Sequence, residues 1–363
     1  MKTLALYIHI PFCQHKCHYC DFYSLEDHTH MDIYVKTLKK SIAYHANILK
    51  RSHQVDTLYF GGGTPNLLTV KQLSDIIQTA REHFTFTQFP EITIEINPEF
   101  SNSEISLQNL KNIGFNRLSI GIQSLNDDEL KFLTRLHTAE TAVNCLKNAR
   151  SIFNNLSVDI IYAIPGQSTQ SLQQTINTIL EFKPDHISAY NLTSEEGTPY
   201  AKMIENGKVS KQDEETEIDF FYRIHDFLEI HGYEHYEVSN YARAGFKSKH
   251  NSSYWNEKDY LGIGPSAHSR LGHERFAYHA DLQAFLDDPE DFHVKDVVTE
   301  ADVLITRLRC SDGLNKNRVS PETWQKIIEY VQKHPKWFIS NENSIKCTLD
   351  GWLVLDTILV DLI

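Results

Sequence analysis

Short apolar runs alternate with longer amphipathic stretches over the first two-thirds of the chain. The short runs are rich in Ile, Leu, Val, Tyr and Phe and end at Gly, Pro or Asn, a pattern typical of β-strands. We predict strands at Ala5–Ile10, Asp56–Phe60, Glu91–Ile96, Arg117–Ile122, Ser157–Ile161 and His186–Asn191. The stretches between them carry apolar residues at helical spacing. We predict helices at Met31–Leu49, Val70–Phe84, Ser103–Ile113, Thr138–Phe153 and Ser168–Phe182.

This alternation predicts an α/β fold. Strand and helix repeat at roughly 30-residue intervals, which is the length of a βαβ unit and indicates a parallel sheet. Six such strands suit a partial (β/α) barrel and an open doubly wound sheet equally well, and the pattern alone leaves both open.

The pattern changes after about residue 197. An acidic helix is predicted at Glu214–His231, and residues 233–285 are rich in Tyr, His, Ser and Asn with weak periodicity. Helices at Thr299–Arg309 and Pro321–His334, a turn-rich strand pair and an apolar helix at Leu353–Leu362 then predict a small winged-helix-like α+β unit. We therefore expect a core at residues 1–196, a helical and irregular extension at 197–298 and a C-terminal domain at 299–363.

Composition and charge narrow the function classes. The chain has 363 residues, of which 41% are hydrophobic and 23% charged, as in ordinary globular proteins. Acidic residues outnumber basic ones 48 to 35, so the formal charge of −13 disfavours a nucleic-acid partner. No apolar run approaches the length of a membrane span. The apolar opening breaks at His9 and Pro11 without a cleavage site, which predicts a cytoplasmic protein.

Three cysteines lie within eight residues, directly after the first predicted strand. Cys13, Cys17 and Cys20 have the spacing C-x3-C-x2-C, and three thiolates on one short loop can converge on a soft metal centre. A structural zinc would take a fourth ligand, which His15 or His18 could supply. An iron–sulfur cluster would keep one iron without a protein ligand, open to an exchangeable small molecule.

Further candidate residues follow the ends of the other predicted strands, where a parallel barrel collects its functional loops. The glycine run at 61–63 is either a tight turn or a place where the backbone approaches a ligand closely. Glu95 ends an apolar strand, so its carboxylate must face the barrel mouth or be paired. Gln123 ends the fourth strand and Asp159 lies within the fifth. Each is either a side-chain cap or part of a strand-to-helix turn, or a hydrogen-bonding group for ribose hydroxyls or adenine. Arg135 offers a cation suited to a carboxylate.

The segment from Tyr7 to Phe22, Tyr-Ile-His-Ile-Pro-Phe-Cys-x3-Cys-x-Tyr-Cys-Asp-Phe, resembles the radical S-adenosylmethionine (SAM) proteins. It is most similar to the branch that contains oxygen-independent coproporphyrinogen dehydrogenase and the haem chaperones. Further motifs of this branch follow in order at 61–65, 95–99, 119–124, 159–166 and 249–255. The resemblance implies a partial (β/α)6 barrel, which would decide between the two sheets above.

The same resemblance implies the cofactors. Cys13, Cys17 and Cys20 would hold a [4Fe-4S] cluster, and SAM would chelate the fourth iron through its amino and carboxylate groups. Reduction of the cluster can then cleave SAM to a 5′-deoxyadenosyl radical. The residues implied to surround one SAM, or two as in the dehydrogenase, are Tyr7, Gly62, Gly63, Thr64, Glu95, Gln123, Arg135 and Asp159.

Two features distinguish the branches. Phe22 stands where the dehydrogenase has a further cysteine, and residues 250–255 read His-Asn-Ser-Ser-Tyr-Trp, the HNxxYW pattern associated with haem in the chaperones. His250 would ligate haem iron, and Tyr254 and Trp255 would pack on the macrocycle. Without the motif, a hydrogen-bonded structural histidine is the ordinary interpretation of His250.

Two hypotheses of different class therefore stand. The first is a haem chaperone that binds haem and passes it to an acceptor protein. The second is a radical enzyme that decarboxylates a coproporphyrinogen propionate to vinyl. The sequence leaves open whether radical chemistry takes place, and the resemblance also allows a cluster-dependent dimer and a transient contact with a membrane protein.

Overall fold

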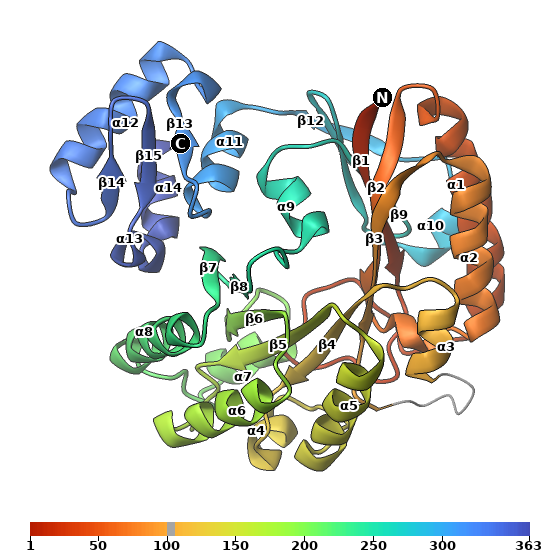
Figure 1. Ribbon diagram of the computed structural model, residues 1–363, viewed down its shortest axis with the longest axis horizontal. Helices are drawn as coiled ribbons and strands as arrows, with labels where there is room; N and C mark the ends of the chain where they lie inside the picture. The colour runs from red at the N-terminus through yellow and green to blue at the C-terminus, as the bar shows by residue number, and fades with distance from the viewer. Residues whose placement is uncertain (100–105) are drawn as a thin grey trace.

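A computed structural model describes residues 1–99 and 106–363, and a long mixed sheet forms its centre (Figure 1). Six parallel strands lie in sequence order, each hydrogen-bonded to the next. They are β1 (Lys2–Ile10), β2 (His53–Gly62), β3 (Phe86–Ile96), β4 (Arg117–Gln123), β5 (Leu156–Tyr162) and β6 (His186–Asn191). All six predicted strands are confirmed.

The sequential strand order decides between the two sheets that the pattern left open. A doubly wound sheet reverses its direction at a switch point, whereas this one runs from β1 to β6 without reversal. In the described part of the chain β1 and β6 do not pair with each other, so the arc is a partial (β/α)6 barrel, as the resemblance implied.

Helices follow the barrel strands as predicted. They are α1 (Met31–Leu49), α2 (Val70–His83), α3 (Leu107–Asn112), α5 (Ala139–Ile152) and α6 (Thr169–Glu181), with the short α4 (Asp127–Phe132) between β4 and α5. Residues 103–105 of the third predicted helix lie outside the described residues. Side-chain caps stabilise the N-termini of several of these helices. Thr69 and Gln72, for example, form a reciprocal capping box at the start of α2.

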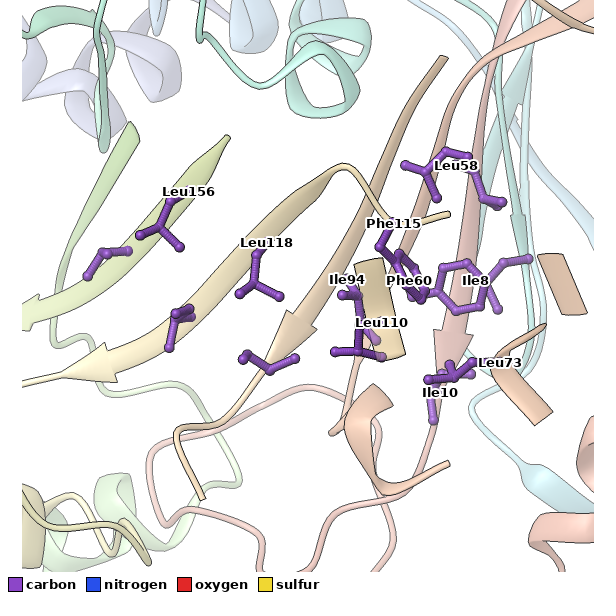
Figure 2. Packing of buried hydrophobic residues seen from close by; sticks show 14 of the residues in the cluster. Ile8, Ile10, Leu58, Phe60, Leu73, Ile94, Leu110, Phe115, Leu118 and Leu156 are labelled. Carbon is purple, nitrogen blue, oxygen red and sulfur yellow. The ribbon is translucent and has the colours of Figure 1, made fainter. Parts of the chain in front are cut away.

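Register places one apolar row on the helix side of the sheet. Ile8, Phe60, Ile94, Leu118 and Leu156 are successive partners across β1 to β5, and all five are fully buried. Figure 2 shows this row packed with Leu73 of α2 and with Leu110 of α3. Side chains alternate between the faces of a strand, so the neighbouring positions face the barrel interior.

The segment expected to be irregular instead extends the sheet at both edges. Beyond β6 lie β8 (Asn240–Ala242) and β7 (Glu234–Glu237); beyond β1 lie β9 (Tyr260–Ile263), β10 (His268–Leu271), β11 (Glu274–Ala277) and β12 (His293–Val297). The helices of this region are α7 (Pro199–Glu205), α8 (Glu214–Ile230), α9 (Lys249–Trp255) and α10 (Leu282–Asp287). Strands of three to five residues are too short to show a period in the sequence.

The C-terminal residues form a small unit with its own apolar cluster. Its three strands are β13 (Leu314–Asn315), β14 (Phe338–Ser340) and β15 (Ser344–Cys347), in the antiparallel order β13-β15-β14. Around them lie α11 (Glu300–Leu308), α12 (Pro321–Lys333), α13 (Leu349–Leu353) and α14 (Leu355–Leu362). Leu304, Ile327, Ile345 and Ile358 are among its core residues. The terminal helix predicted at Leu353–Leu362 is confirmed as α14, and the short α13 precedes it.

Among the described helices, not one combines the length and the apolar character needed to cross a membrane.

Candidate cofactor and ligand site

Two adjoining cavities open on the inner face of the barrel. The smaller, of about 430 Å³, is lined by all three clustered cysteines and by the glycine loop after β2. The larger, of about 680 Å³, reaches toward α9 and α11. Both cavities are lined by Asp21, Phe22, Glu95, Asp159 and Tyr190. A molecule in one cavity would therefore lie beside a molecule in the other.

The cysteines lie on the loop between β1 and α1 and contact polar groups from the loop after β2 and from the loop after α4. The hydroxyl of Thr64 lies 3.6 Å from the sulfur of Cys13, and the guanidinium of Arg135 lies 3.6 Å from that of Cys17. Burial raises the pKa of the Cys13 thiol and raises that of Cys20 to about 11. A metal centre would supply the positive charge that holds such thiols as thiolates.

The geometry of this loop distinguishes the two metal hypotheses. Within residues 1–99 and 106–363, no three His, Cys, Asp or Glu side chains converge closely enough to hold one metal ion. His15 is paired with Glu26 at 3.0 Å, and His18 stacks on Tyr200 with ring centroids 5.7 Å apart. A four-iron cluster spaces its thiolates around a body much wider than one ion. Three cysteines on one cavity therefore fit a cluster better than a zinc.

The glycine loop fixes the cysteine loop in place. The amides of Gly63 and Thr64 donate to the carbonyls of Ile10 and Phe12, at 2.8 and 2.7 Å. A Cβ on Gly63 would lie 2.5 Å from the Phe12 carbonyl oxygen, so this close approach requires glycine. The tight-turn interpretation of the loop thus has direct support, and the loop still lines the smaller cavity.

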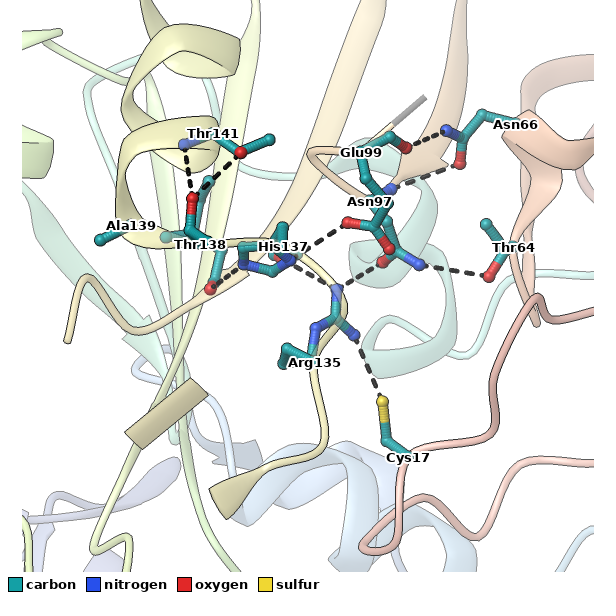
Figure 3. A network of polar contacts seen from close by, with 12 residues as sticks. Cys17, Thr64, Asn66, Asn97, Glu99, Arg135, His137, Thr138, Ala139 and Thr141 are labelled. Atoms are coloured by element: carbon teal, nitrogen blue, oxygen red, sulfur yellow. Dashed lines mark hydrogen bonds and ion pairs between the residues drawn. The ribbon is translucent and has the colours of Figure 1, made fainter. Parts of the chain in front are cut away.

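Arg135 belongs to a polar network that the sequence did not reveal (Figure 3). Its guanidinium donates to the side-chain oxygen of Asn97 at 2.6 Å and to the carbonyl of Gly121 at 3.1 Å. Glu99 in turn lies 3.2 Å from a ring nitrogen of His137. Asn97 and Glu99 belong to the motif at 95–99, but nothing in the pattern separated their side chains from loop residues.

The two candidate carboxyls lie on β3 and β5, on either side of β4, and line both cavities. Glu95 accepts from the Tyr59 hydroxyl at 2.7 Å and from the Gly62 amide at 3.3 Å, and burial raises its pKa to about 7. Asp159 accepts from the Ser119 hydroxyl at 3.2 Å, and burial raises its pKa as well. Both carboxyls can accept a hydrogen bond from a ligand, and Glu95 exchanges its proton near neutral pH.

The remaining predicted residues divide between the cavities. Gln123 lines the smaller cavity and has a φ of +65°, an uncommon conformation for a residue other than glycine. Tyr7 lines the larger cavity only. The structure thus brings the glycine loop, Glu95, Gln123, Arg135 and Asp159 together around the cavity of the cysteines. Tyr7 lies in the adjoining larger cavity.

The wall of the larger cavity near α9 is aromatic. His250 is fully buried and stacks on Tyr59 with centroids 4.7 Å apart. Its ring nitrogens lie 2.7 Å from the Thr57 hydroxyl and 2.7 Å from the Tyr254 hydroxyl, and burial lowers its pKa to about 3. The imidazole is therefore neutral at physiological pH, as iron ligation requires, but both of its nitrogens already have partners.

The HNxxYW segment is helical. Ser248 caps α9, and the buried carboxylate of Glu91 accepts from the amide of His250 at 3.1 Å. The guanidinium of Arg309, just after α11, lies 4.0 Å from the Trp255 ring centroid. The motif is thus fixed both by the barrel and by the C-terminal unit, and it forms a helix within the extension whose periodicity is weak.

The chain is similar to several known proteins. The family model of the Radical SAM superfamily matches residues 7–179. "Heme chaperone HemW" of Bacillus subtilis is 33% identical over 86% of this chain and 85% of its own length. "Radical S-adenosyl methionine domain-containing protein 1, mitochondrial" of Danio rerio is 31% identical over 98% of the chain and 86% of its length. The solved structure of "Coproporphyrinogen III oxidase (HemN) from Escherichia coli" aligns with a TM-score of 0.82 at 24% identity, over 99% and 90% of the two chains, and shows the same fold.

Proposed function

Because the chain belongs to the radical SAM superfamily, within the family of its HemW relatives, we propose that it binds haem in the larger cavity and passes it to an acceptor protein. The observation that carries this proposal is the cavity of about 680 Å³, whose wall near α9 is aromatic and contains the HNxxYW helix. Aromatic side chains together with a few placed polar groups are typical of sites for flat cofactors.

We propose that the smaller cavity holds the resident cofactors. Cys13, Cys17 and Cys20 would hold the cluster, and the side chains of Glu95 and Asp159 would receive donors of SAM. When bound, the cluster supplies electrons, and SAM supplies a cleavable sulfonium. The part of the protein in this site is to place the thiols with the help of Thr64 and Arg135 and to keep two carboxyls ready to accept hydrogen bonds.

Reconstitution tests the cluster assignment. The protein should take up about four irons and four sulfides per monomer under anaerobic conditions. Cys17→Ser should lose most of this iron, because a hydroxyl is a far weaker iron ligand than a thiolate. Cys145→Ser, which changes a buried cysteine of α5 away from the site, is the matched control and should keep the full content. Full iron content in both variants would contradict the assignment.

We propose His250 as a ligand of haem iron. Ligation at the nitrogen now facing Tyr254 would require that hydroxyl to turn away, while the other nitrogen donates its hydrogen to Thr57 and so fixes the tautomer. His250→Ala should therefore shift the Soret band of bound haem. His268, an exposed histidine of the same cavity, is the matched comparison. A Soret shift with His268→Ala and none with His250→Ala would show that the iron ligand is His268 of β10, and would contradict the proposal.

A second function, oxidative decarboxylation of a coproporphyrinogen, is supported by the shared wall of the two cavities. A radical formed in the smaller cavity would arise beside a porphyrinogen in the larger one. One assay separates the two functions: reconstituted protein, SAM and a reductant are offered coproporphyrinogen and haem in parallel. Stoichiometric haem uptake without vinyl product supports the chaperone, and vinyl product contradicts it.

Four further points stay predictions: transfer of haem to an acceptor protein, a cytoplasmic location, a cluster-dependent dimer and a transient contact with a membrane protein.

A further inference from the structure

The proposed function gives no role to the most deeply buried charge of the larger cavity. Arg117, the first residue of β4, is 2% exposed and lines this cavity. Among the described residues its guanidinium has no hydrogen-bond or ion-pair partner, and its Nε is a buried donor without an acceptor. A guanidinium has five N–H donors and keeps its charge at any physiological pH. Such a group is costly to bury unpaired, so it points to an anion that binds from outside.

The other arginines of the two cavities are paired. Arg270 lies 3.5 Å from Glu257, and Arg275 is bonded to Asp302. Arg135 donates to Asn97 in the smaller cavity. Arg117 is thus the exception among the cavity arginines of the described chain.

Groups near Arg117 do not neutralise it. Thr93, its register partner on β3, also has a buried oxygen without a partner, and one water between them would satisfy a single donor and leave the charge unpaired. The charge of Arg117 lowers the pKa of Glu95 and of Asp159, but among the described residues neither carboxyl lies within ion-pair distance of it. These carboxyls accept hydrogen bonds from Tyr59, Gly62 and Ser119 instead.

The surroundings of Arg117 suit a carboxylate. The next inward positions across β4 to β6 are Ser119, Ser157 and His186, all of which line the same cavity. The same cavity is also lined by Tyr254 and Trp255 of α9. The cavity therefore offers polar and basic groups from β4 to β6 and aromatic side chains from α9. Haem has a matching distribution of groups, because its macrocycle is largely apolar and its two propionate side chains lie together on one edge.

We propose that Arg117 binds a propionate carboxylate of the tetrapyrrole and so sets the direction in which the macrocycle enters the cavity. Arginine pairs with carboxylates through two parallel N–H···O bonds, which fix orientation as well as charge. This inference rests on the proposed function, because it takes a tetrapyrrole as the occupant of the larger cavity.

A cycle of two proteins and two ligands tests the inference. Haem and haem dimethyl ester, which lacks the free carboxylates, are titrated from the same solvent into wild-type protein and Arg117→Gln. We expect Arg117→Gln to weaken haem binding by roughly 10- to 100-fold, as for loss of a charged hydrogen bond. Esterification should weaken binding to the wild type by a similar factor and should cause little further loss in the variant.

Two controls make the outcome decisive. Arg223→Gln removes an exposed arginine of α8 that pairs with Asp219 and does not line the cavity, so its preference for haem should equal that of the wild type. Ligand-free Arg117→Gln should unfold within a few degrees of the wild type, because no hydrogen bond or ion pair of the guanidinium to the described residues is lost. A marked loss of thermal stability would contradict that claim.

The remaining outcomes distinguish a failure of this inference from a failure of the proposed function. Equal discrimination between haem and its ester by wild type and Arg117→Gln overturns this inference and leaves the proposed function intact. A wild-type protein that binds neither ligand overturns both. Arg117→Lys should keep part of the preference for haem, because it retains the charge and loses the two-pronged geometry.

Discussion

At the residue scale, the inner wall of the barrel keeps ionisable groups out of water and so changes their protonation. Glu95 is the clearest case, since its pKa of about 7 lies above the ordinary value of a glutamate because the carboxyl is buried. The hydrogen bond from Tyr59 opposes this effect without cancelling it. The free energy of unfolding must therefore depend on pH through this residue.

Glu95→Gln tests this dependence in the ligand-free protein. The unfolded chain loses the Glu95 proton at a lower pH than the folded chain, so wild-type stability falls as the pH rises from about 4.5 to about 7. The variant lacks this loss. Its unfolding free energy relative to wild type should rise by up to about 3 kcal/mol over that range and then level off. Urea unfolding at a series of pH values measures it. Glu82→Gln, exposed on α2, should show no such trend.

The sequence could predict some of these residues and not others. Cys13, Cys17 and Cys20 follow from their spacing, and Glu95 and Asp159 from a charge within an apolar strand. Asn97, Glu99, His137 and Arg117 could not be singled out. Their significance comes from partners, or a lack of partners, that only the folded chain creates.

At the scale of elements, strand register sorts the chemistry. One row across β1 to β5 is wholly apolar and packs on helices, while the adjacent inward positions carry Tyr59, Glu95, Ser119 and Asp159. The barrel strands and their helices were predictable because apolar runs and amphipathic stretches alternate regularly along this part of the chain. The edge strands and α9 were not, because no such alternation marks them and their positions are set by contacts distant in sequence.

Gly62 at the end of β2 and Gly114 between α3 and β4 offer a matched pair of substitutions. Their φ values are similar, +105° and +113°, and such values strain any residue other than glycine. A Cβ on Gly62 would lie 2.5 Å from the His9 ring, whereas a Cβ on Gly114 has no heavy atom within 4 Å. Gly114→Ala should thus cost only the backbone strain, about 1–2 kcal/mol. Gly62→Ala should cost more, since His9 must also move.

Chemical denaturation of both alanine variants gives the comparison. Equal costs would show that His9 yields freely and that the glycine loop is not held tightly against β1. Loss of iron on reconstitution should accompany Gly62→Ala and not Gly114→Ala, because only the first loop contacts the cysteine loop.

At the scale of the whole molecule, the C-terminal unit is joined to the HNxxYW helix. Arg309 pairs with the fully buried Glu237 of β7 at 3.1 Å and stacks over Trp255 of α9. Asp302, Ile305 and Thr306 of α11 also line the larger cavity. The unit thus forms part of the wall of the proposed haem site.

Arg309→Ala tests this junction. It leaves the Glu237 carboxylate buried without its cation, so we expect a loss of about 3–5 kcal/mol in unfolding free energy. Arg223→Ala, which breaks an exposed ion pair on α8, should cost less than about 1 kcal/mol. Comparable losses in the two variants would mean that the junction does not depend on the buried pair.

The central claim is that haem occupies the larger cavity, and one titration tests it most directly. Haem is added to anaerobic protein and followed at the Soret band, with Ile305→Trp as a partial block of the cavity. Ile339→Trp, a more exposed isoleucine away from the cavity, is the control. Saturation at about one haem per monomer in the wild type and in Ile339→Trp, with uptake strongly reduced in Ile305→Trp, is the result predicted. Equal uptake by all three proteins, or binding without saturation, would contradict the account.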